Sequence, residues 1–196
     1  MPHVVMLSGS PAVQSRSQHL LRFAEEMLRE RGFSVQRIDV RQLPAVALIH
    51  GDWNDPAVRV AQEAITHAHA VVIATPLYKA SYSGVLKTFL DLLPRTALAD
   101  KPVLSFATGG SPAHLLALDY ALKPVLAALG ARLILDNVFA TEYEIPLTDG
   151  IYTLTDELGQ RLFDAVESLA QTLDDRAMLE RLRDPVHAAR EYAVPQ

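Results

Sequence analysis

The sequence contains no cysteine among its 196 residues, no long hydrophobic run and no excess of positive charge. The absence of cysteine excludes disulfides, thiolate zinc sites, iron–sulfur clusters held by the chain and a cysteine nucleophile. No stretch reaches about 18 uninterrupted apolar residues, and the N-terminus is too short and too lightly charged for a signal peptide. The formal net charge of −5 argues against broad nucleic-acid or anionic-membrane binding. We therefore expect a cytoplasmic protein with no nucleic-acid or membrane partner.

Apolar residues make up 49% of the chain and charged residues 21%, which is typical of a globular domain. Short apolar runs alternate with segments of helical periodicity. The runs predict buried strands at residues 3–7, 33–40, 70–75, 102–107 and 133–139. The periodic segments predict helices at residues 17–31, 56–69, 84–93 and 113–129, and a last helix capped by Thr153 or Thr155.

Five strands separated by helices predict an α/β fold with a doubly wound, five-stranded parallel sheet flanked by helices. We expect a single domain over residues 1–173, in which residues 44–55 and 76–81 are loops. The charged residues 174–196 are expected to form a C-terminal arm or helix. In such sheets ligands bind beyond the carboxyl ends of the strands, so the loops that leave those ends are the candidates for a site.

The first of these loops, residues 8–17, is rich in serine and contains Arg16 near a helix start. Hydroxyls, free backbone N–H groups, a helix N-terminus and an arginine are the components of a phosphate site. The loop lacks the lysine of a P-loop and the glycine spacing of a Rossmann fingerprint, so neither nucleoside triphosphate nor dinucleotide binding of those kinds is supported. An ordinary serine-rich connection with a helix cap remains the alternative.

Two further loops complete the candidate site. Residues 75–84 contain Tyr78 and Tyr82, which would either form an apolar wall beside the flat ring of a ligand or pack on neighbouring loops. Residues 108–111 contain paired glycines, which would either let a ligand approach the backbone or serve a turn with positive φ. Together the three loops describe a phosphate end and an aromatic end of one ligand.

The histidines do not point to a metal site. His67 and His69 lie near a predicted helix end and have no further ligand at suitable spacing. His114 follows the paired glycines and is interpreted as a surface residue in a first helical turn. We expect no bound metal.

Pro124 lies inside the predicted helix over residues 113–129 and cannot donate a hydrogen bond to the carbonyl of Tyr120. The helix must therefore kink or widen locally, and widened turns are frequent at functional sites. A tolerated kink with Tyr120 packed in the core is the alternative. We favour a site-shaping or interface role for Tyr120.

Three long runs, GSPAVQSRS, VVIATPLYKASYSGVLKTFLDLLP and FATGGSPAHLLALDYALKPVLAALGA, resemble the NADPH-dependent FMN reductases. Within this family they are most similar to the reductase components of two-component alkanesulfonate monooxygenase systems, and the resemblance covers residues 4–140. It implies a flavodoxin-like fold, a homo-oligomer (dimer or tetramer) and a π-type insertion at Tyr120 linked to the subunit interface. It also implies reduction of free FMN by NADPH, or by NADH, for delivery to an FMNH2-dependent monooxygenase of sulfonate-sulfur utilisation.

The resemblance also assigns FMN-binding residues in each of the three loops. The implied set is Ser10, Ser15, Arg16 and Ser17 for the phosphate, Pro76, Leu77, Tyr78 and Lys79 beside the ring, and Thr108, Gly109 and Gly110 in the second ring-side loop. No catalytic side chain is expected, because the two cofactors carry the hydride chemistry. A quinone or azo-dye reductase that retains FMN, and a flavodoxin-type electron carrier, are the alternative functions.

Overall fold

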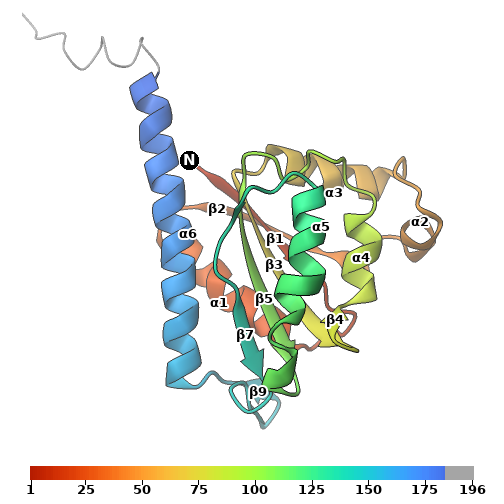
Figure 1. Cartoon of the computed structure of the whole chain (residues 1–196), viewed down its shortest axis with the longest axis vertical. Helices are drawn as coiled ribbons and strands as arrows, with labels where there is room; N and C mark the ends of the chain where they lie inside the picture. The colour runs from red at the N-terminus through yellow and green to blue at the C-terminus, as the bar shows by residue number, and fades with distance from the viewer. Residues whose placement is uncertain (184–196) are drawn as a thin grey trace, which may run out of the picture.

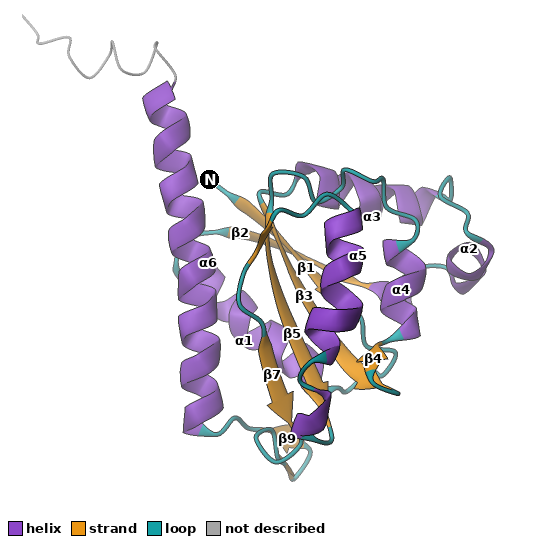
Figure 2. Ribbon diagram, viewed as in Figure 1, coloured by secondary structure: helices purple, strands orange, loops and turns teal. Residues whose placement is uncertain are grey.

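The computed structural model describes residues 1–183, which form an α/β/α sandwich (Figures 1 and 2). The main strands are β1 (His3–Ser8), β2 (Ser34–Asp39), β3 (Ala70–Tyr78), β5 (Pro102–Gly109), β6 (Leu133–Ile134) and β7 (Val138–Thr141). The helices are α1 (Arg16–Glu30), α2 (Ala45–His50), α3 (Pro56–His67), α4 (Gly84–Leu90), α5 (Lys123–Ala128) and α6 (Asp156–Arg183). Two small hairpins involve β4 (Ser81–Tyr82), β8 (Leu147–Thr148) and β9 (Ile151–Tyr152).

The central sheet runs in the order β2–β1–β3–β5, and β6 and β7 together complete its far edge. All of these pairings are parallel, whereas β4 folds back antiparallel on the end of β3. The order reverses between β1 and β3, which is the flavodoxin-like topology. The predicted α/β fold with a doubly wound parallel sheet is confirmed.

The sheet is buried on both faces because successive side chains of each strand enter opposite cores. In β1, Val4 and Met6 face α1 and α6, while Val5 and Leu7 face the layer of α3, α4 and α5. Figure 1 shows α1 and α6 on one side of the sheet and the other helices on the opposite side. This continuous apolar burial explains why the strands read as uninterrupted apolar runs.

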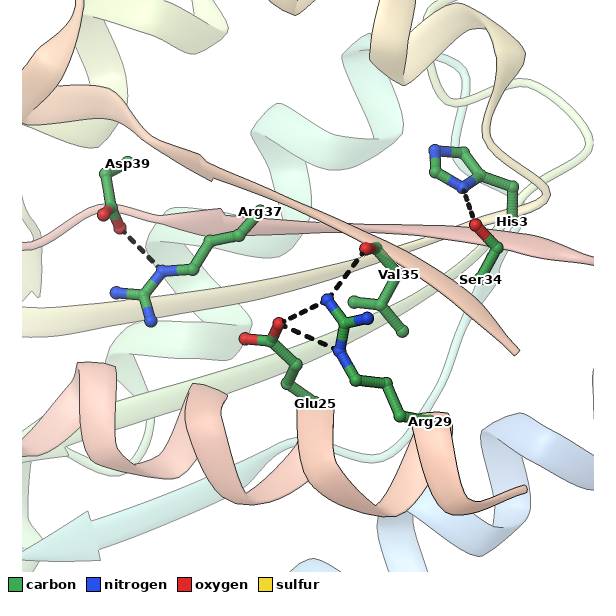
Figure 3. A network of polar contacts seen from close by, with 7 residues as sticks. All are labelled: His3, Glu25, Arg29, Ser34, Val35, Arg37 and Asp39. Atoms are coloured by element: carbon green, nitrogen blue, oxygen red, sulfur yellow. Dashed lines mark hydrogen bonds and ion pairs between the residues drawn. The ribbon is translucent and has the colours of Figure 1, made fainter. Parts of the chain in front are cut away.

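Polar contacts fix the far end of α1 against the edge strand β2 (Figure 3). The Arg29 guanidinium contacts the Glu25 carboxylate at 2.8 Å and donates to the Val35 carbonyl at 3.1 Å. The ring of His3 lies 3.1 Å from the Ser34 hydroxyl and joins β1 to β2. With its C-terminal turn anchored there, α1 presents its N-terminal turn to the carboxyl ends of the strands.

Three helices begin directly after a capping side chain. The Asp55 carboxylate accepts hydrogen bonds from the N–H groups of Ala57 and Val58, and Pro56 occupies the first position of α3. The Ser83 hydroxyl caps α4, and the Thr155 hydroxyl accepts from the N–H of Leu158 at the start of α6. Of the two predicted caps of the last helix, Thr153 and Thr155, the structure has Thr155.

Two of the predicted loops contain regular structure. The expected loop over residues 44–55 contains the short helix α2, which buries Ala47 and Leu48 and ends at Gly51 with a φ of +70°. Strand β3 continues beyond Thr75 to Tyr78, because Leu77 and Tyr78 pair with β4 in an antiparallel hairpin. The loop expected at residues 76–81 is thus mostly strand.

The predicted fifth strand, residues 133–139, is broken into β6 and β7. Val103 pairs with Ile134, and Phe106 pairs with Val138. Between these two pairs the edge segment therefore contains one residue more than β5. An extra residue interrupts a ladder in the manner of a bulge, and Asp136 and Asn137 are poor strand formers. The break therefore follows from the polar pair inside the apolar run.

The predicted helix over residues 113–129 is not continuous. Pro112–His114 form a 3-10 turn, Leu118–Leu122 a π-helix and only Lys123–Ala128 an α-helix. The N–H of Lys123 reaches back to the carbonyl of Leu118, five residues earlier. The irregularity predicted from Pro124 is present, and the Tyr120 side chain is 78% exposed in the chain rather than packed in its core.

Helix α6 carries an apolar stripe that is buried throughout: Leu158, Leu162, Val166, Leu169 and Leu173. Residues 174–183 continue this helix without a break. The remainder of the predicted C-terminal arm, residues 184–196, lies outside the described residues. Among the described residues, no helix is long and apolar enough to cross a membrane.

Candidate functional site

A hollow of about 210 Å³ opens at the carboxyl edge of the sheet, where β1, β3 and β5 end. Its lining contains nine of the residues that the sequence assigned to cofactor binding: Ser10, Ser15, Arg16, Pro76, Leu77, Tyr78, Thr108, Gly109 and Gly110. Parallel strands bring their carboxyl ends to one edge, and the switch in strand order leaves a crevice there. The three loops identified from the sequence therefore meet in one place.

The polar end of the hollow is the start of α1. The Ser15 hydroxyl makes no capping bond to the first turn and lies 2.8 Å from the hydroxyl of Ser17. The first helical bond is made by the N–H of His19 to the carbonyl of Ser15, which leaves the preceding amides at the helix start available to an anion. Ser17 itself is fully buried and supports Ser15 instead of lining the hollow.

Arg16 is held across the hollow by segments distant in sequence. Its Nε donates to the carbonyl of Ile145 at 3.1 Å, and a terminal nitrogen lies 3.5 Å from the Glu142 carboxylate. The guanidinium also lies over the ring of Tyr152, 5.7 Å from its centroid. Arg16 is therefore preoriented, and its charge is only partly compensated because the Glu142 side chain is 57% exposed.

The first ring-side wall is the end of β3 and its hairpin with β4. Pro76, Leu77 and Tyr78 line the hollow, and Tyr78 is 49% exposed. The two central residues of the hairpin, Lys79 and Ala80, have φ of +51° and +61°. Lys79 does not line the hollow, so its predicted place beside the ring is the second exception after Ser17.

The first two loops are tied together by buried polar contacts. The hydroxyl of Ser83 donates to the carbonyl of Gly9, and the N–H of Ser83 donates to the hydroxyl of Thr75 at 3.1 Å. Both side chains are buried. These bonds fix the polar loop relative to the ring-side wall without entering the hollow.

The second ring-side wall is the end of β5. Neither Gly109 nor Gly110 has a positive φ, so the alternative of a turn requiring one is wrong. A Cβ on Gly109 would lie 3.1 Å from the ring of Phe139, so a larger residue there would require that ring to move by a few tenths of an ångström. A Cβ on Gly110 would lie 3.7 Å from a Glu142 oxygen, which is ordinary contact and leaves that position open to the hollow.

Sequence reasoning missed four lining residues: Ala12, Gln14, Glu142 and Tyr152. Glu142 lies just past β7, and a network fixes its turn. The Glu144 carboxylate accepts from the N–H and hydroxyl of Thr141 at 2.7 and 2.8 Å and pairs with Arg161 of α6. Residues 142–152 carry no periodic pattern, so nothing in the sequence points to this turn.

The lining fits a phosphate-bearing aromatic cofactor. Hydroxyls, the N-terminus of α1 and Arg16 lie at one end, and Pro76, Leu77 and Tyr78 form an apolar surface at the other. A volume below the roughly 300–1,000 Å³ of pockets that enclose a drug-sized ligand means that a large ligand would stay partly exposed. Within residues 1–183 no cluster of three or more acidic or histidine side chains is arranged to hold a metal ion.

Residues 2–144 match the family model of the NADPH-dependent FMN reductases. The chain belongs to this family. Membership makes it an NAD(P)H:FMN oxidoreductase, with FMN and NAD(P)H as its cofactors, and agrees with the resemblance seen in the sequence.

Two curated relatives match along most of their length. An FMN reductase (NADPH) of Pseudomonas putida KT2440 is 45% identical over 88% of this chain and 89% of its own. An FMN reductase (NADPH) of Escherichia coli K12 is 42% identical over 94% of this chain and 99% of its own. A more distant relative from Pseudomonas fluorescens, the NADH-dependent FMN reductase SfnF, is 35% identical over 69% of this chain and 63% of its own.

Solved structures agree with the fold. The apo form of an NADH:FMN oxidoreductase, EMOB, superposes with a TM-score of 0.81 at 37% identity, covering 88% of this chain and 90% of that one. A Streptococcus pneumoniae flavodoxin superposes with a TM-score of 0.61 at 14% identity over 88% of this chain and 99% of that one. The second likeness concerns the fold alone.

Proposed function

We propose that FMN binds in the hollow with its phosphate at the start of α1 and its ring between the ends of β3 and β5. The observation that carries this proposal is the convergence of Ser15, Arg16, Tyr78 and Gly110 on one hollow. Arginine and helix N-termini bind phosphate by charge-assisted hydrogen bonds. The apolar wall that ends in Tyr78 offers a flat surface to a ring.

When bound, FMN and the nicotinamide supply the chemistry, which is hydride transfer from nicotinamide C4 to flavin N5. The chain contributes orientation and electrostatics. Its backbone N–H groups near Pro76–Lys79 or Thr108–Ser111, proline excepted, would stabilise negative charge that develops on the reduced flavin. We assign no side chain as a proton donor.

We infer that reduced FMN leaves the enzyme for an FMNH2-dependent monooxygenase of sulfonate-sulfur utilisation. The shallowness of the hollow supports release, because a large ligand there stays partly exposed. The sulfonate assignment rests on the three sequence runs alone. We place this exchange in the cytoplasm, where both cofactors are available.

The deciding experiment is oxidation of NADPH or NADH by the purified protein with and without added FMN. A flavin-releasing reductase should be nearly colourless as isolated and should consume nucleotide only when FMN is supplied. A yellow protein that reduces a quinone or azo dye without free FMN would favour the reductase that retains its flavin. A yellow protein with no turnover on either acceptor would favour an electron carrier.

We also infer that the protein is a homo-oligomer joined through the segment around the π-helix. Leu115, Leu116 and Tyr120 expose large apolar side chains there, at 49%, 55% and 78%. Neighbouring apolar side chains of this size on a surface are typical of interaction sites. Tyr120→Ala should therefore lower the oligomeric state measured by light scattering or alter flavin retention, while the circular dichroism spectrum is unchanged.

Tyr143→Ala is the matched control, because Tyr143 is also exposed, at 86%, and lies outside the segment. If both variants keep the wild-type mass, flavin affinity and turnover, the interface and site-shaping roles of Tyr120 are wrong.

A further inference from the structure

A second hollow, of about 190 Å³, adjoins the flavin hollow along α1. The two share Gln14, Ser15 and Tyr152 as a common rim. The second hollow is completed by His19 and Arg22 of α1 and by the hairpin between β8 and β9. A ligand that lies in the flavin hollow can therefore extend directly into the second one.

Three basic side chains follow this path. Arg16, His19 and Arg22 are spaced three residues apart, so they lie along one face of α1 and span about 9 Å at the rise of an α-helix. Arg16 is held by Ile145 and Glu142, as described above. Arg22, by contrast, forms neither a hydrogen bond nor an ion pair with any residue in the described range 1–183.

The two groups in the second hollow carry different charges. Burial, and then the positive charge of Arg22, lower the pKa of His19, so this imidazole is neutral near pH 7. The Glu26 carboxylate acts on His19 in the opposite sense but forms no ion pair with Arg22 among the described residues, so the exposed Arg22 is the cation of the hollow. A single unpaired guanidinium at the edge of a hollow is suited to an anionic group such as a phosphate.

Tyr152 forms the wall between the two hollows. Its ring lies 5.7 Å from the Arg16 guanidinium carbon and 5.9 Å from the His19 ring centroid, at an interplanar angle of 45° to the imidazole. The wall is thus an aromatic surface with a cation at one side and an imidazole beside it. Such a surface accepts a flat base or a ribose that passes from one hollow to the other.

We propose that the second hollow binds the adenosine end of the nicotinamide donor, and that Arg22 contacts the 2′-phosphate that distinguishes NADPH from NADH. The inference rests on the proposed position of FMN. Hydride transfer requires the nicotinamide to lie against the flavin, with the reacting atoms about 3–3.5 Å apart. The rest of the dinucleotide must then leave the flavin hollow, and the second hollow offers an exit across the shared rim with the exposed Arg22 as its cation.

The kinetic test compares NADPH and NADH at saturating FMN for wild type, Arg22→Ala and Arg22→Lys. Arg22→Ala should lower kcat/KM for NADPH about tenfold and that for NADH less than about twofold, because only NADPH carries the extra phosphate. Arg22→Lys should recover part of the loss. Arg59→Ala, which removes another exposed arginine, from α3, should leave both values unchanged.

A binding test separates this inference from the proposed function. Calorimetry should detect adenosine 2′,5′-bisphosphate binding to wild type about tenfold more tightly than ADP, and Arg22→Ala should abolish that difference. This readout needs neither FMN nor turnover, so it holds even if wild type fails to reduce FMN, which would contradict the proposed function instead.

Three results would overturn the inference. One is an equal loss with NADPH and NADH in Arg22→Ala. Another is a rise in the KM for FMN, which would assign Arg22 to the flavin phosphate. The third is unchanged affinity of Arg22→Ala for adenosine 2′,5′-bisphosphate.

Discussion

The two ends of the flavin hollow are built in different ways. At the polar end, Arg16 is placed by side-chain and carbonyl contacts from residues 142–152, far along the chain. At the ring-side end, the wall is placed by strand pairing: it consists of the last residues of β3 and β5, and β3 leads into a tight hairpin with β4. The polar end should therefore respond to changes of charge, whereas the ring-side end should respond to changes of shape.

The largest expected effect is at the polar end. Arg16→Ala should weaken FMN binding about tenfold or more, since a charge-assisted hydrogen bond contributes about 1.5–3 kcal/mol. Riboflavin, which lacks the phosphate, should lose much less. Fluorescence titration with both flavins measures the contrast, and equal weakening of the two would remove the phosphate from this end.

The ring-side end should show the opposite pattern with a smaller effect. Tyr78→Ala removes an aromatic surface and should weaken FMN and riboflavin alike, by about three- to tenfold, or lower turnover. Tyr78→Phe keeps the ring and serves as the control. Wild-type affinity and kinetics in a folded Tyr78→Ala variant would exclude Tyr78 from the ring site.

Removing the negative charge of Glu142 tests the same electrostatic account of the polar end. Its carboxylate lies beside Arg16, where it opposes an incoming phosphate, and its partial exposure limits the effect. Glu142→Gln should tighten FMN binding about two- to fivefold and leave riboflavin unchanged. Weaker FMN binding in this variant would mean instead that Glu142 acts mainly by orienting Arg16.

The smallest effect concerns the hairpin behind the ring-side wall. Lys79 and Ala80 occupy positions with positive φ, where Asn-Gly or Asp-Gly is favoured, whereas the second hairpin has Asp149 and Gly150 at the equivalent positions. Ala80→Gly should stabilise the protein by about 0.5–1 kcal/mol. Gly150→Ala should destabilise it by about as much, since a Cβ there meets no atom within 4 Å and only its φ of +79° is unfavourable.

Urea denaturation of both variants measures these changes. The two hairpins are compared because the strained turn at Lys79 and Ala80 follows directly after Tyr78 of the ring-side wall. Both expectations assume that alanine is unfavourable at a positive φ. If Ala80→Gly does not stabilise the protein, or if Gly150→Ala does not destabilise it, the first hairpin is not strained.

The same division explains what the sequence could predict. The loops after β1, β3 and β5 follow apolar runs and contain serine, proline and paired glycine, so their meeting at one edge follows from the topology of a parallel sheet. The irregular turn at Tyr120 was predictable because Pro124 has no N–H to donate.

Other features depend on contacts between distant segments and were therefore missed. Glu142 reaches the hollow from the turn after β7, which Glu144 and Arg161 fix, and Tyr152 reaches it from the hairpin of β8 and β9. The hairpin at Lys79 has none of the residues that mark a tight turn. Ser17 matched a binding motif but is buried beneath Ser15, a distinction that only packing makes.

The most direct test of the account is a crystal structure of the protein grown with FMN, in which the position of the phosphate is measured. We expect the phosphate oxygens within hydrogen-bonding distance of the Ser15 hydroxyl and the Arg16 guanidinium, with the ring against Pro76–Tyr78. A flavin whose phosphate lies away from the start of α1, or whose ring lies outside the hollow, would contradict the account.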